Sequence, residues 1–566
     1  MVNSSPRMTA PALVAALACI APAIPALAQE RPKLVLQITV DQLRGDLIER
    51  FGAGLGEGGF RRLIRGGVHF TQAHHGHANT ETIVGHTTLA TGADPAVHGM
   101  VANVWFDRVE GGQVYNVQDP DYPLVGAAGV DAATEIDPTQ RAATTDGRSP
   151  GNILTSTIAD EIGMCFGPEA LIFGVSVKDR GAISMAGHTG QAYWFSKSEG
   201  RFVTSTFYRD DYPGWVRDWN GSGMVASYAG TSWTLSDAPE SYMFGTRDDQ
   251  PWETDFPGFG RSFPHPWGEA DDKYYTTRLT LSPAGDEITV DFAKALIEAE
   301  GIGQDAVPDY LSISLSSTDY VGHVFGPSSL EAEDNIRRLD RTLADLLDFV
   351  DDRVGLDQVL VVLSADHGSP ENPGYLATHG IKAGTFDFER VDTEPGFVRL
   401  GAQFGEARAL IRNFSSPYVY LNRELIAEKG LDPATVEDSV ARELDLLPGI
   451  DLAVSSRRLR EGQIGEGKVV DAVRRNFHRD RSGDIYVVFE PHWFIADFDG
   501  LTVASAHGSP WTYDTHVPVI FHGPGIPPAR IARHVETVDV APTIAAYLGT
   551  KLPSGATGVP LTEVLD

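Results

Sequence analysis

The stretch Leu34-Val35-Leu36-Gln37-Ile38-Thr39-Val40, followed at once by Asp41, decides the fold class. It is a short, almost continuous apolar run with β-branched residues, which is typical of a strand buried on both faces of a parallel sheet. Four further runs have the same character, and several end close to a charged residue. These runs cover residues 171–177, 310–315, 359–363 and 517–521.

Helical patterns lie between the apolar runs. In residues 330–354, for example, five apolar residues share one face of a helix: Leu339, Leu343, Leu346, Leu347 and Val350. Strands that alternate with helices predict an α/β fold with a mostly parallel central sheet. Residues of about 190–290 and 375–500 do not follow the alternation, and we interpret both as insertions that cap the ligand-binding edge of the sheet.

The first 28 residues have the features of an export signal. They carry one charged residue, Arg7, then an apolar run over 10–24 and the small-residue cleavage motif Ala26-Leu27-Ala28. We therefore expect an exported protein, periplasmic or secreted, with a mature chain of 29–566. A membrane anchor is disfavoured because the run is short and contains prolines. Lipidation at Cys19 remains an alternative.

Charge and cysteine content restrict the partners and the metal chemistry. The 566 residues have a formal net charge of −32. This charge disfavours nucleic acid and anionic membranes as general partners, so a phosphate site must supply its own positive charge. The only cysteines are Cys19 and Cys165. Signal cleavage would leave one, so metal sites must be built from histidines and carboxylates. We expect no membrane span in the mature chain.

Short motifs at or after the predicted strands contain residues that bind metals. Ligand sites in open α/β sheets lie outside the carboxyl ends of the strands. Three aspartates and three histidines occur in such motifs: Asp41, Asp319, His323, Asp366, His367 and His507. They would serve two sites of three ligands each, the ligand number of a catalytic zinc site. Two neighbouring metals can stabilise both the attacking and the leaving oxygen of a phosphoryl transfer.

Residues 79–92 offer a nucleophile. Thr82 is expected at a helix N-terminus, where unpaired N–H groups favour a phosphoryl group, and a metal could activate its hydroxyl. Taken alone, the segment favours the simpler reading of Thr82 as a helix N-cap. Five histidines near Thr82 are interpreted as loop residues or as partners of the ligands: His74, His75, His77, His86 and His98.

Lys178 and Arg180 offer the positive charge that a phosphate site needs. They are two residues apart, so on an extended segment both side chains would point the same way. Two cations match the dianionic group of a phosphate monoester better than that of a diester. Without the other motifs, a solvated surface triplet would be the better interpretation.

The order of these motifs resembles the alkaline phosphatase superfamily, most closely the phosphate-irrepressible, threonine-nucleophile (PafA-type) alkaline phosphatases. Thr82-Ile-Val-Gly-His86, Thr91-Gly92 and His98-Gly99-Met100-Val101-Ala102-Asn103 correspond to motifs of the phosphodiesterase branch. Lys178-x-Arg180 matches a signature of the PafA type alone. The resemblance extends from residue 34 to about 545 and implies a three-layer alkaline-phosphatase-like fold with cap insertions.

The resemblance also implies roles for individual residues. Thr82 would be the nucleophile and form a phosphothreonine intermediate. Two Zn²⁺ per subunit would be held by two triads, one of Asp319, His323 and His507 and the other of Asp41, Asp366 and His367. The non-bridging oxygens of a phosphate monoester would be bound by Asn103, Lys178 and Arg180.

Other functions remain open at this stage. The nearest is a nucleotide pyrophosphatase/phosphodiesterase of the same superfamily, which the Lys-x-Arg pair disfavours. An arylsulfatase is disfavoured because no Cys/Ser-x-Pro-x-Arg motif occupies the Thr82 region. A non-catalytic periplasmic protein that binds metal or phosphate is the alternative from a different class. The oligomeric state stays open, and a monomer is compatible with the sequence.

Overall fold

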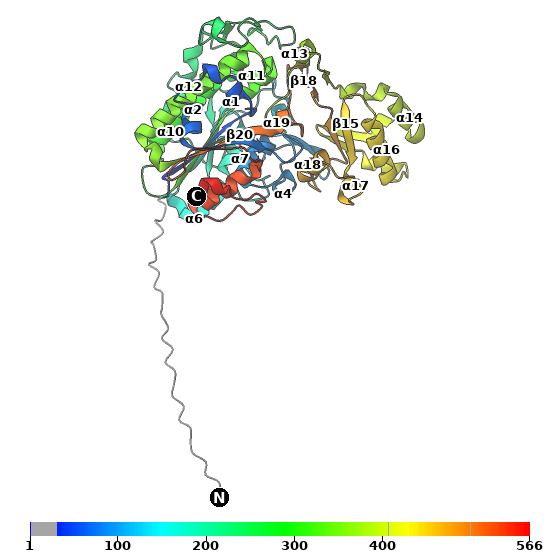
Figure 1. Cartoon of the computed structure of the whole chain (residues 1–566). Coiled ribbons are helices and arrows are strands. Elements are labelled where there is room, and N and C mark those ends of the chain that lie inside the picture. Colours follow the sequence, from blue (N-terminus) through cyan, green and yellow to red (C-terminus); the bar gives the residue numbers. More distant parts are fainter. Residues whose placement is uncertain (2–30, 406, 499, 566) are drawn as a thin grey trace. The chain divides into compact units, whose positions relative to one another are not determined.

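The computed structural model describes residues 1, 31–405, 407–498 and 500–565. Residues from Arg31 onward form one compact unit (Figure 1). The predicted signal peptide, residues 1–28, lies outside the described residues except for Met1. Among the described residues, none of the helices has the length and apolar character needed to cross a membrane.

A ten-stranded sheet forms the centre of this unit. Its strand order is β21 (Ala529–Ile531), β2 (Val68–His74), β20 (His516–His522), β11 (Val359–Ser364), β1 (Leu34–Val40), β10 (Asp309–Leu315), β5 (Ile172–Ser176), β6 (Gln191–Ser196) and β7 (Arg201–Val203), with β22 (Val535–Glu536) paired to β2. The five strands from β11 to β6 are parallel. This arrangement confirms the predicted fold class.

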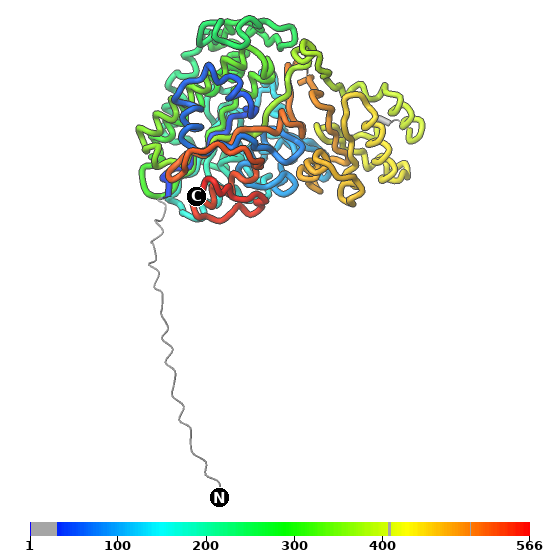
Figure 2. The backbone as a smooth tube through the Cα atoms, viewed as in Figure 1, coloured from blue at the N-terminus to red at the C-terminus, as the bar shows by residue number. Residues whose placement is uncertain are grey.

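One strand runs in the direction opposite to the expected one. We predicted that residues 517–521 belong to a parallel sheet, but β20 is antiparallel to both β11 and β2. Figure 2 shows β2 (blue) and β20 (orange) side by side. A strand buried on both faces needs apolar residues whichever way it runs, so the sequence pattern does not reveal direction.

Helices cover both faces of the sheet and create three layers. Leu36 and Ile38 of β1 share a core with α10 (Ala284–Glu300) and α12 (Leu330–Arg353). Val35, which points to the opposite face, shares a core with α6 (Ile158–Phe166) and α20 (Val540–Leu548). Figure 1 shows α10 and α12 on one side of the sheet and α6 on the other. The five leucine and valine positions predicted for one face of α12 are all buried.

The segment that we interpreted as the second insertion contains a sheet of its own. Its antiparallel strand order is β13 (Ile411–Ser415), β14 (Tyr418–Leu421), β16 (Ile485–Phe489) and β15 (Ile450–Ser455). Helices α14 (Pro395–Phe404) and α16 (Pro433–Asp445) share a separate hydrophobic core with it. In the first segment, β6 and β7 extend the main sheet, so the alternation of strands and helices continues past residue 190.

Candidate metal and phosphate site

The first cluster of metal-ligand side chains follows two neighbouring strands. Asp41 comes directly after β1, and Asp366 and His367 come shortly after β11, which pairs with β1 in parallel. Each of the three residues is fully buried, and they offer ligand atoms that lie within 4.8 Å of one another. We call Asp41, Asp366 and His367 the strand-end cluster.

The strand-end cluster fits a divalent metal ion. Asp41 Oδ1 and His367 Nε2 are buried and make no hydrogen bond within the described part of the chain. Leaving polar atoms buried without partners is costly, and a cation between them would remove that cost. Carboxylate and imidazole ligands suit Zn²⁺ as well as other divalent metals.

Charges in this cluster shift the pKa values of its members in different directions. Burial by itself would raise the pKa of the Asp41 carboxyl, but the nearby Lys178 ammonium and His367 together outweigh burial and lower it. Burial and the Asp41 charge together raise the pKa of Asp366. Burial disfavours protonation of His367, but Asp366 and Asp41 outweigh it and raise the pKa to about 9. A metal must therefore displace a proton from His367 at neutral pH.

The second cluster lies on a helix and a loop. Asp319 and His323 are on α11 (Ser317–Phe325), four residues apart and hence on the same face of the helix. His507 comes from the loop between β19 (Leu501–Thr502) and β20. Asp319 Oδ1 lies 3.2 Å from His323 Nε2 and 3.3 Å from His507 Nε2. We call Asp319, His323 and His507 the helix–loop cluster.

Backbone carbonyls orient both histidines of the helix–loop cluster. His323 Nδ1 lies 2.8 Å from the Ser505 carbonyl oxygen, and His507 Nδ1 lies 2.9 Å from that of Thr80. A proton on Nδ1 in each ring leaves Nε2 free as a metal ligand.

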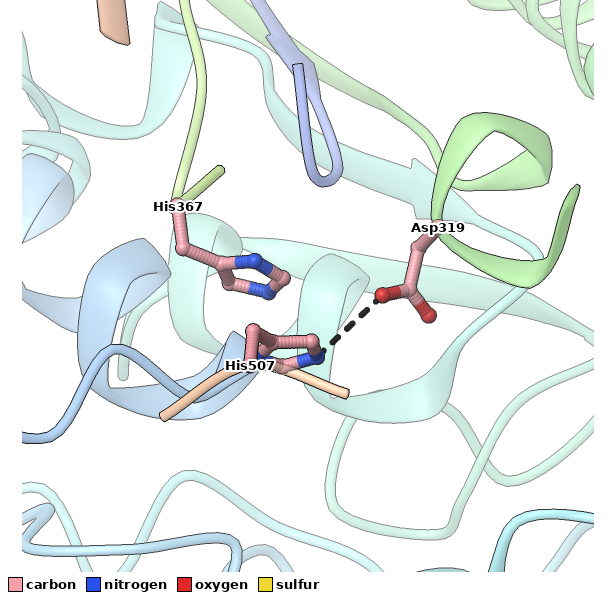
Figure 3. Close-up of side chains that lie close together, drawn as sticks. All are labelled: Asp319, His367 and His507. Atoms are coloured by element: carbon pink, nitrogen blue, oxygen red, sulfur yellow. Dashed lines mark ion pairs between the residues drawn. The ribbon is translucent and has the colours of Figure 1, made fainter. Parts of the chain in front are cut away.

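The two clusters meet at His367. Its ring stacks on that of His507 with centroids 3.6 Å apart. Asp319, His367 and His507 also offer ligand atoms within 4.8 Å of one another (Figure 3). The structure thus brings all six predicted ligands to one edge of the sheet, but it leaves two groupings for the second metal, one with His323 and one with His367.

Thr82 is the first residue of α3 (Thr82–Thr91), and it does not cap the helix. Glu81 occupies the N-cap position, so the simpler interpretation of Thr82 as the cap is wrong. The Thr82 hydroxyl is buried, and its Oγ1 accepts hydrogen bonds from Lys178 Nζ and Arg180 Nη2, each at 3.4 Å. The hydroxyl therefore lies beside two cations at a helix N-terminus.

Close contact between α3 and the strand-end cluster requires a glycine. A Cβ atom on Gly85 would lie 1.9 Å from the Asp366 carbonyl oxygen. One residue later, His86 Nδ1 lies 2.9 Å from the Thr82 carbonyl oxygen and 3.0 Å from Asp366 Oδ2. His86 therefore contacts a predicted ligand, in the supporting position that we expected.

Lys178 and Arg180 reach Thr82 from the junction between a strand and a helix. Lys178 has an extended backbone as the N-cap of α7 (Asp179–Ala186), but Arg180 lies in the first turn of that helix, so the prediction of one extended segment is wrong. Strand β5 ends at Ser176, shortly before the helix begins, and both side chains reach Thr82. Lys178 Nζ also lies 2.7 Å from Asp41 Oδ2 and 2.5 Å from Asp319 Oδ2, between the two clusters.

Asn103 lies at the N-terminus of α3. Its Oδ1 accepts a hydrogen bond of 3.1 Å from the Ile83 N–H, and its own N–H donates to Glu81 Oε2. All ten residues that we predicted for the site thus lie in one region.

The sequence reasoning missed Gln42. Its backbone N–H donates to Asp366 Oδ1 at 3.1 Å, and its side-chain amide donates to Asp319 Oδ1 at 2.7 Å. Gln42 has a φ of 65°, which the sequence pattern does not reveal. Its place next to Asp41 is the one signal that could have identified it. Asp137, which pairs with Arg180, was also missed.

Comparisons with known proteins identify relatives of the whole chain. Residues 35–523 match the family described as type I phosphodiesterase/nucleotide pyrophosphatase. The chain is 33% identical over 539 residues to alkaline phosphatase PafA of Elizabethkingia meningoseptica, covering 94% of this chain and 95% of that protein. It is 34% identical over 539 residues to alkaline phosphatase PhoV of Synechococcus elongatus, covering 94% and 93%.

A solved structure extends the likeness to the fold. The crystal structure of a PafA variant, substituted at one threonine, one asparagine, one lysine and one arginine, matches with a TM-score of 0.85 at 31% identity. The match covers 94% of this chain and 99% of that one.

These findings identify the chain as a member of the type I phosphodiesterase/nucleotide pyrophosphatase family. Within that family it groups with the alkaline phosphatases PafA and PhoV, and it is a phosphoric monoester hydrolase. The predicted alkaline phosphatase activity is thereby confirmed.

Proposed function

We propose that this alkaline phosphatase uses two zinc ions and the Thr82 hydroxyl, and that a phosphothreonine is formed and hydrolysed in each turnover. The observation that carries the proposal is the position of Thr82 Oγ1, which accepts hydrogen bonds from Lys178 and Arg180 at a helix N-terminus. Lys178 in turn contacts one aspartate of each metal-ligand cluster.

The PafA variant supports the choice of residues. The threonine and the asparagine substituted in it are separated along the chain by the same number of residues as Thr82 and Asn103. Its substituted lysine and arginine have the same separation as Lys178 and Arg180.

In the proposed reaction, Thr82 Oγ1 gives up its proton and attacks phosphorus, and the P–O bond to the alcohol breaks. The leaving oxygen keeps the electron pair and takes up a proton to give the alcohol. A water oxygen then attacks the phosphothreonine, the P–Oγ1 bond breaks, and Oγ1 takes up a proton, which releases phosphate and restores the hydroxyl. When bound, the two metal ions would supply positive charge at the attacking and leaving oxygens. Lys178, Arg180 and the first N–H groups of α3 would hold the non-bridging oxygens, together with Asn103.

The strand-end cluster would hold the metal near Thr82, because Asp366 contacts His86 in the first turns of α3. The helix–loop cluster would hold the second metal, with His367 in contact with both. Zinc is the proposed metal because the family resemblance implies it and each cluster offers the three nitrogen and oxygen ligands of a catalytic zinc site. Metal content measured on purified protein should give two zinc equivalents per chain.

Kinetics of Thr82→Ala test the nucleophile. We expect kcat/KM for p-nitrophenyl phosphate to fall at least about 10³-fold, with both metals retained, because the hydroxyl forms the covalent bond. Thr82→Ser is the matched control and should keep most of the activity. A Thr82→Ala variant with activity near wild type would reject the nucleophile.

Two further measurements separate this mechanism from its alternatives. Two in-line displacements give retention at phosphorus, so a chiral phosphate ester that reacts with inversion would exclude the phosphothreonine. Turnover that persists after a chelator has removed the metals would exclude the two metals from the reaction.

We further propose that the protein is exported and that residues of about 375–500 form a cap on the site. The cap proposal is supported by the hairpin of β18 (Asp497–Phe498) and β19, in which the Phe498 ring lies 5.1 Å from that of His323. Mass spectrometry of the protein recovered from the periplasm or medium should give a chain that begins at Gln29.

A further inference from the structure

Among the described residues, the Arg180 guanidinium forms an ion pair with one carboxylate, that of Asp137. Its Nη2 lies 2.8 Å from Asp137 Oδ2 and donates to Thr82 Oγ1 at 3.4 Å, and its Nη1 donates to the Tyr115 hydroxyl at 3.4 Å. Arg180 Nε is buried and makes no hydrogen bond within the described residues. The direction of the guanidinium toward Thr82 therefore depends mainly on Asp137.

The second carboxylate oxygen of Asp137 is fixed by its own helix. Asp137 is the N-cap of α5 (Pro138–Arg141), and its Oδ1 accepts from the Thr139 N–H at 2.9 Å and from the Thr139 hydroxyl at 2.6 Å. The Asp137 N–H donates to Glu135 Oε1 at 2.9 Å. The carboxylate is therefore held in one orientation, with Oδ2 directed at Arg180.

The short segment around Asp137 is attached to the rest of the site at both ends. Glu135 pairs with Lys197, and Lys197 Nζ donates to the Tyr320 hydroxyl at 3.1 Å. Tyr320 follows the metal-ligand candidate Asp319 in the sequence. At the other end, Arg141 Nη2 donates to the Phe498 carbonyl oxygen at 3.2 Å. These contacts give Asp137 a fixed position relative to the metal-ligand helix and the β18–β19 hairpin.

We propose that Asp137 is a positioning residue that fixes the Arg180 guanidinium against the phosphoryl group, and thereby sets the preference for monoesters over diesters. An arginine side chain has many rotamers, and holding it in the productive one before substrate binds lowers the cost of binding. A dianionic monoester gains more from a fixed guanidinium than a monoanionic diester does. The inference rests on the proposed contact between Arg180 and phosphate.

The charge state of the pair agrees with this role. Burial alone would raise the pKa of the Asp137 carboxyl, but the Arg180 charge, the hydrogen bond from Thr139 and nearby lysines together outweigh burial and lower it. Burial likewise opposes the charge on Arg180, yet Asp137, with smaller contributions from neighbouring tyrosines and Asp179, raises its pKa well above the ordinary value. Both groups are therefore ionised throughout the neutral and alkaline range in which an alkaline phosphatase is assayed.

A double-mutant cycle with two substrates tests the inference on the zinc-loaded enzyme. The substrates are p-nitrophenyl phosphate and methyl p-nitrophenyl phosphate, which share a leaving group and differ in charge. The variants are Asp137→Ala, Arg180→Ala and the double variant, with Asp137→Glu as the conservative replacement. Asp146→Ala, on an exposed position of the same part of the chain, is the control and should match wild type.

We expect Asp137→Ala to lower kcat/KM for the monoester about tenfold and for the diester by no more than about twofold. Arg180→Ala should lower the monoester value about 100-fold. Adding Asp137→Ala to Arg180→Ala should have no further effect, because Asp137 acts through Arg180. Asp137→Glu should recover part of the monoester activity.

Three outcomes would overturn the inference. Equal losses on both substrates would mean that Asp137 only stabilises the fold, and additive losses in the double variant would mean that it does not act through Arg180. If Arg180→Ala leaves the monoester-to-diester ratio unchanged, the proposed phosphate contact itself fails. If Asp137→Ala does not fold, as judged by circular dichroism, the same comparisons made with Asp137→Asn decide the question.

Discussion

The strand-end cluster and the helix–loop cluster offer the same ligand types, but the protein holds them in different ways. The strand-end cluster is fully buried and follows two paired strands at the centre of the sheet. The helix–loop cluster combines a helix with a loop far along the chain, and its two histidine side chains are 7% and 11% exposed. One cluster is thus fixed by the sheet, and the other depends on how the segment before β20 folds back.

This difference predicts different tolerance to the loss of a ligand. In the strand-end cluster, Gln42 and His86 contact Asp366, and among the described residues the one group of ligand atoms that contains Asp41 also contains Asp366. In the helix–loop cluster, Asp319 and His507 stay 3.3 Å apart without His323, whose side chain is 11% exposed, so water can reach the position that His323 would leave.

The largest effect is expected for Asp366→Ala. It removes a ligand from the buried cluster and leaves His367 and Asp41 without their shared metal, so kcat/KM should fall at least about 10³-fold. Metal analysis should show the loss of one zinc equivalent, even in excess zinc. Activity restored by added zinc would contradict the view that this cluster has no substitute ligand.

A smaller effect is expected for His323→Ala. Because Asp319 and His507 still offer two ligands and water can occupy the third position, kcat/KM should fall about 10- to 100-fold and recover in part when zinc is added. His379→Ala, on an exposed position, is the control. If His323→Ala lowers kcat/KM as much as Asp366→Ala does and added zinc does not restore it, metal binding in the two clusters depends equally on each ligand.

The contact between α3 and the strand-end cluster can be tested through Gly85→Ala. The added methyl group would lie 1.9 Å from the Asp366 carbonyl oxygen, so the helix must shift. We expect the free energy of unfolding to fall by about 1–3 kcal/mol, together with a loss of activity. Gly52→Ala, where nothing lies within 4 Å of the new atom, is the matched control. Unchanged stability in Gly85→Ala would remove the steric argument.

The smallest effect on activity is expected for a change at Asp286, which contacts the start of α11 and affects how stability depends on pH. Asp286 Oδ1 accepts the N–H of Ser317, at the start of α11, and burial raises the pKa of Asp286 to about 7 from 3.8. A raised pKa in the folded state gives stability that is full below about pH 4 and is lost as pH rises to about 7. The Asp286→Asn side chain carries no charge, so this variant does not lose stability as the pH rises over this range.

Asp286→Asn should therefore gain up to about 4 kcal/mol of unfolding free energy relative to wild type between pH 4 and pH 8. Denaturant unfolding of both proteins at the two pH values measures this difference. A difference that stays constant with pH would mean that Asp286 does not titrate in this range in the folded protein.

The sequence predicted the parts of the site that depend on strand ends. Asp41, Lys178 and Asp366 were found because buried parallel strands leave long apolar runs, and the residues after them meet at one edge. It gave the wrong direction for β20 and the wrong local structure for Arg180. Both errors have one cause, because apolar content reports burial and says little about direction or about where a helix begins.

Other features needed the tertiary structure. Asp137 is separated from Arg180 by more than forty positions of loops, helix and strand, and no local pattern marks it as the partner of an arginine. Gln42 matters because its positive φ directs both its N–H and its amide to the two clusters.

The sequence by itself thus determined the fold class, the alkaline phosphatase resemblance and the residue types of the site. Buried strands leave apolar runs in the sequence, and the order of motifs can be read directly from it. Only the tertiary structure decided that Thr82 is not the helix cap, that His367 adjoins both clusters and that Asp137 holds Arg180. These depend on distances between segments far apart in sequence, and such distances are set by packing.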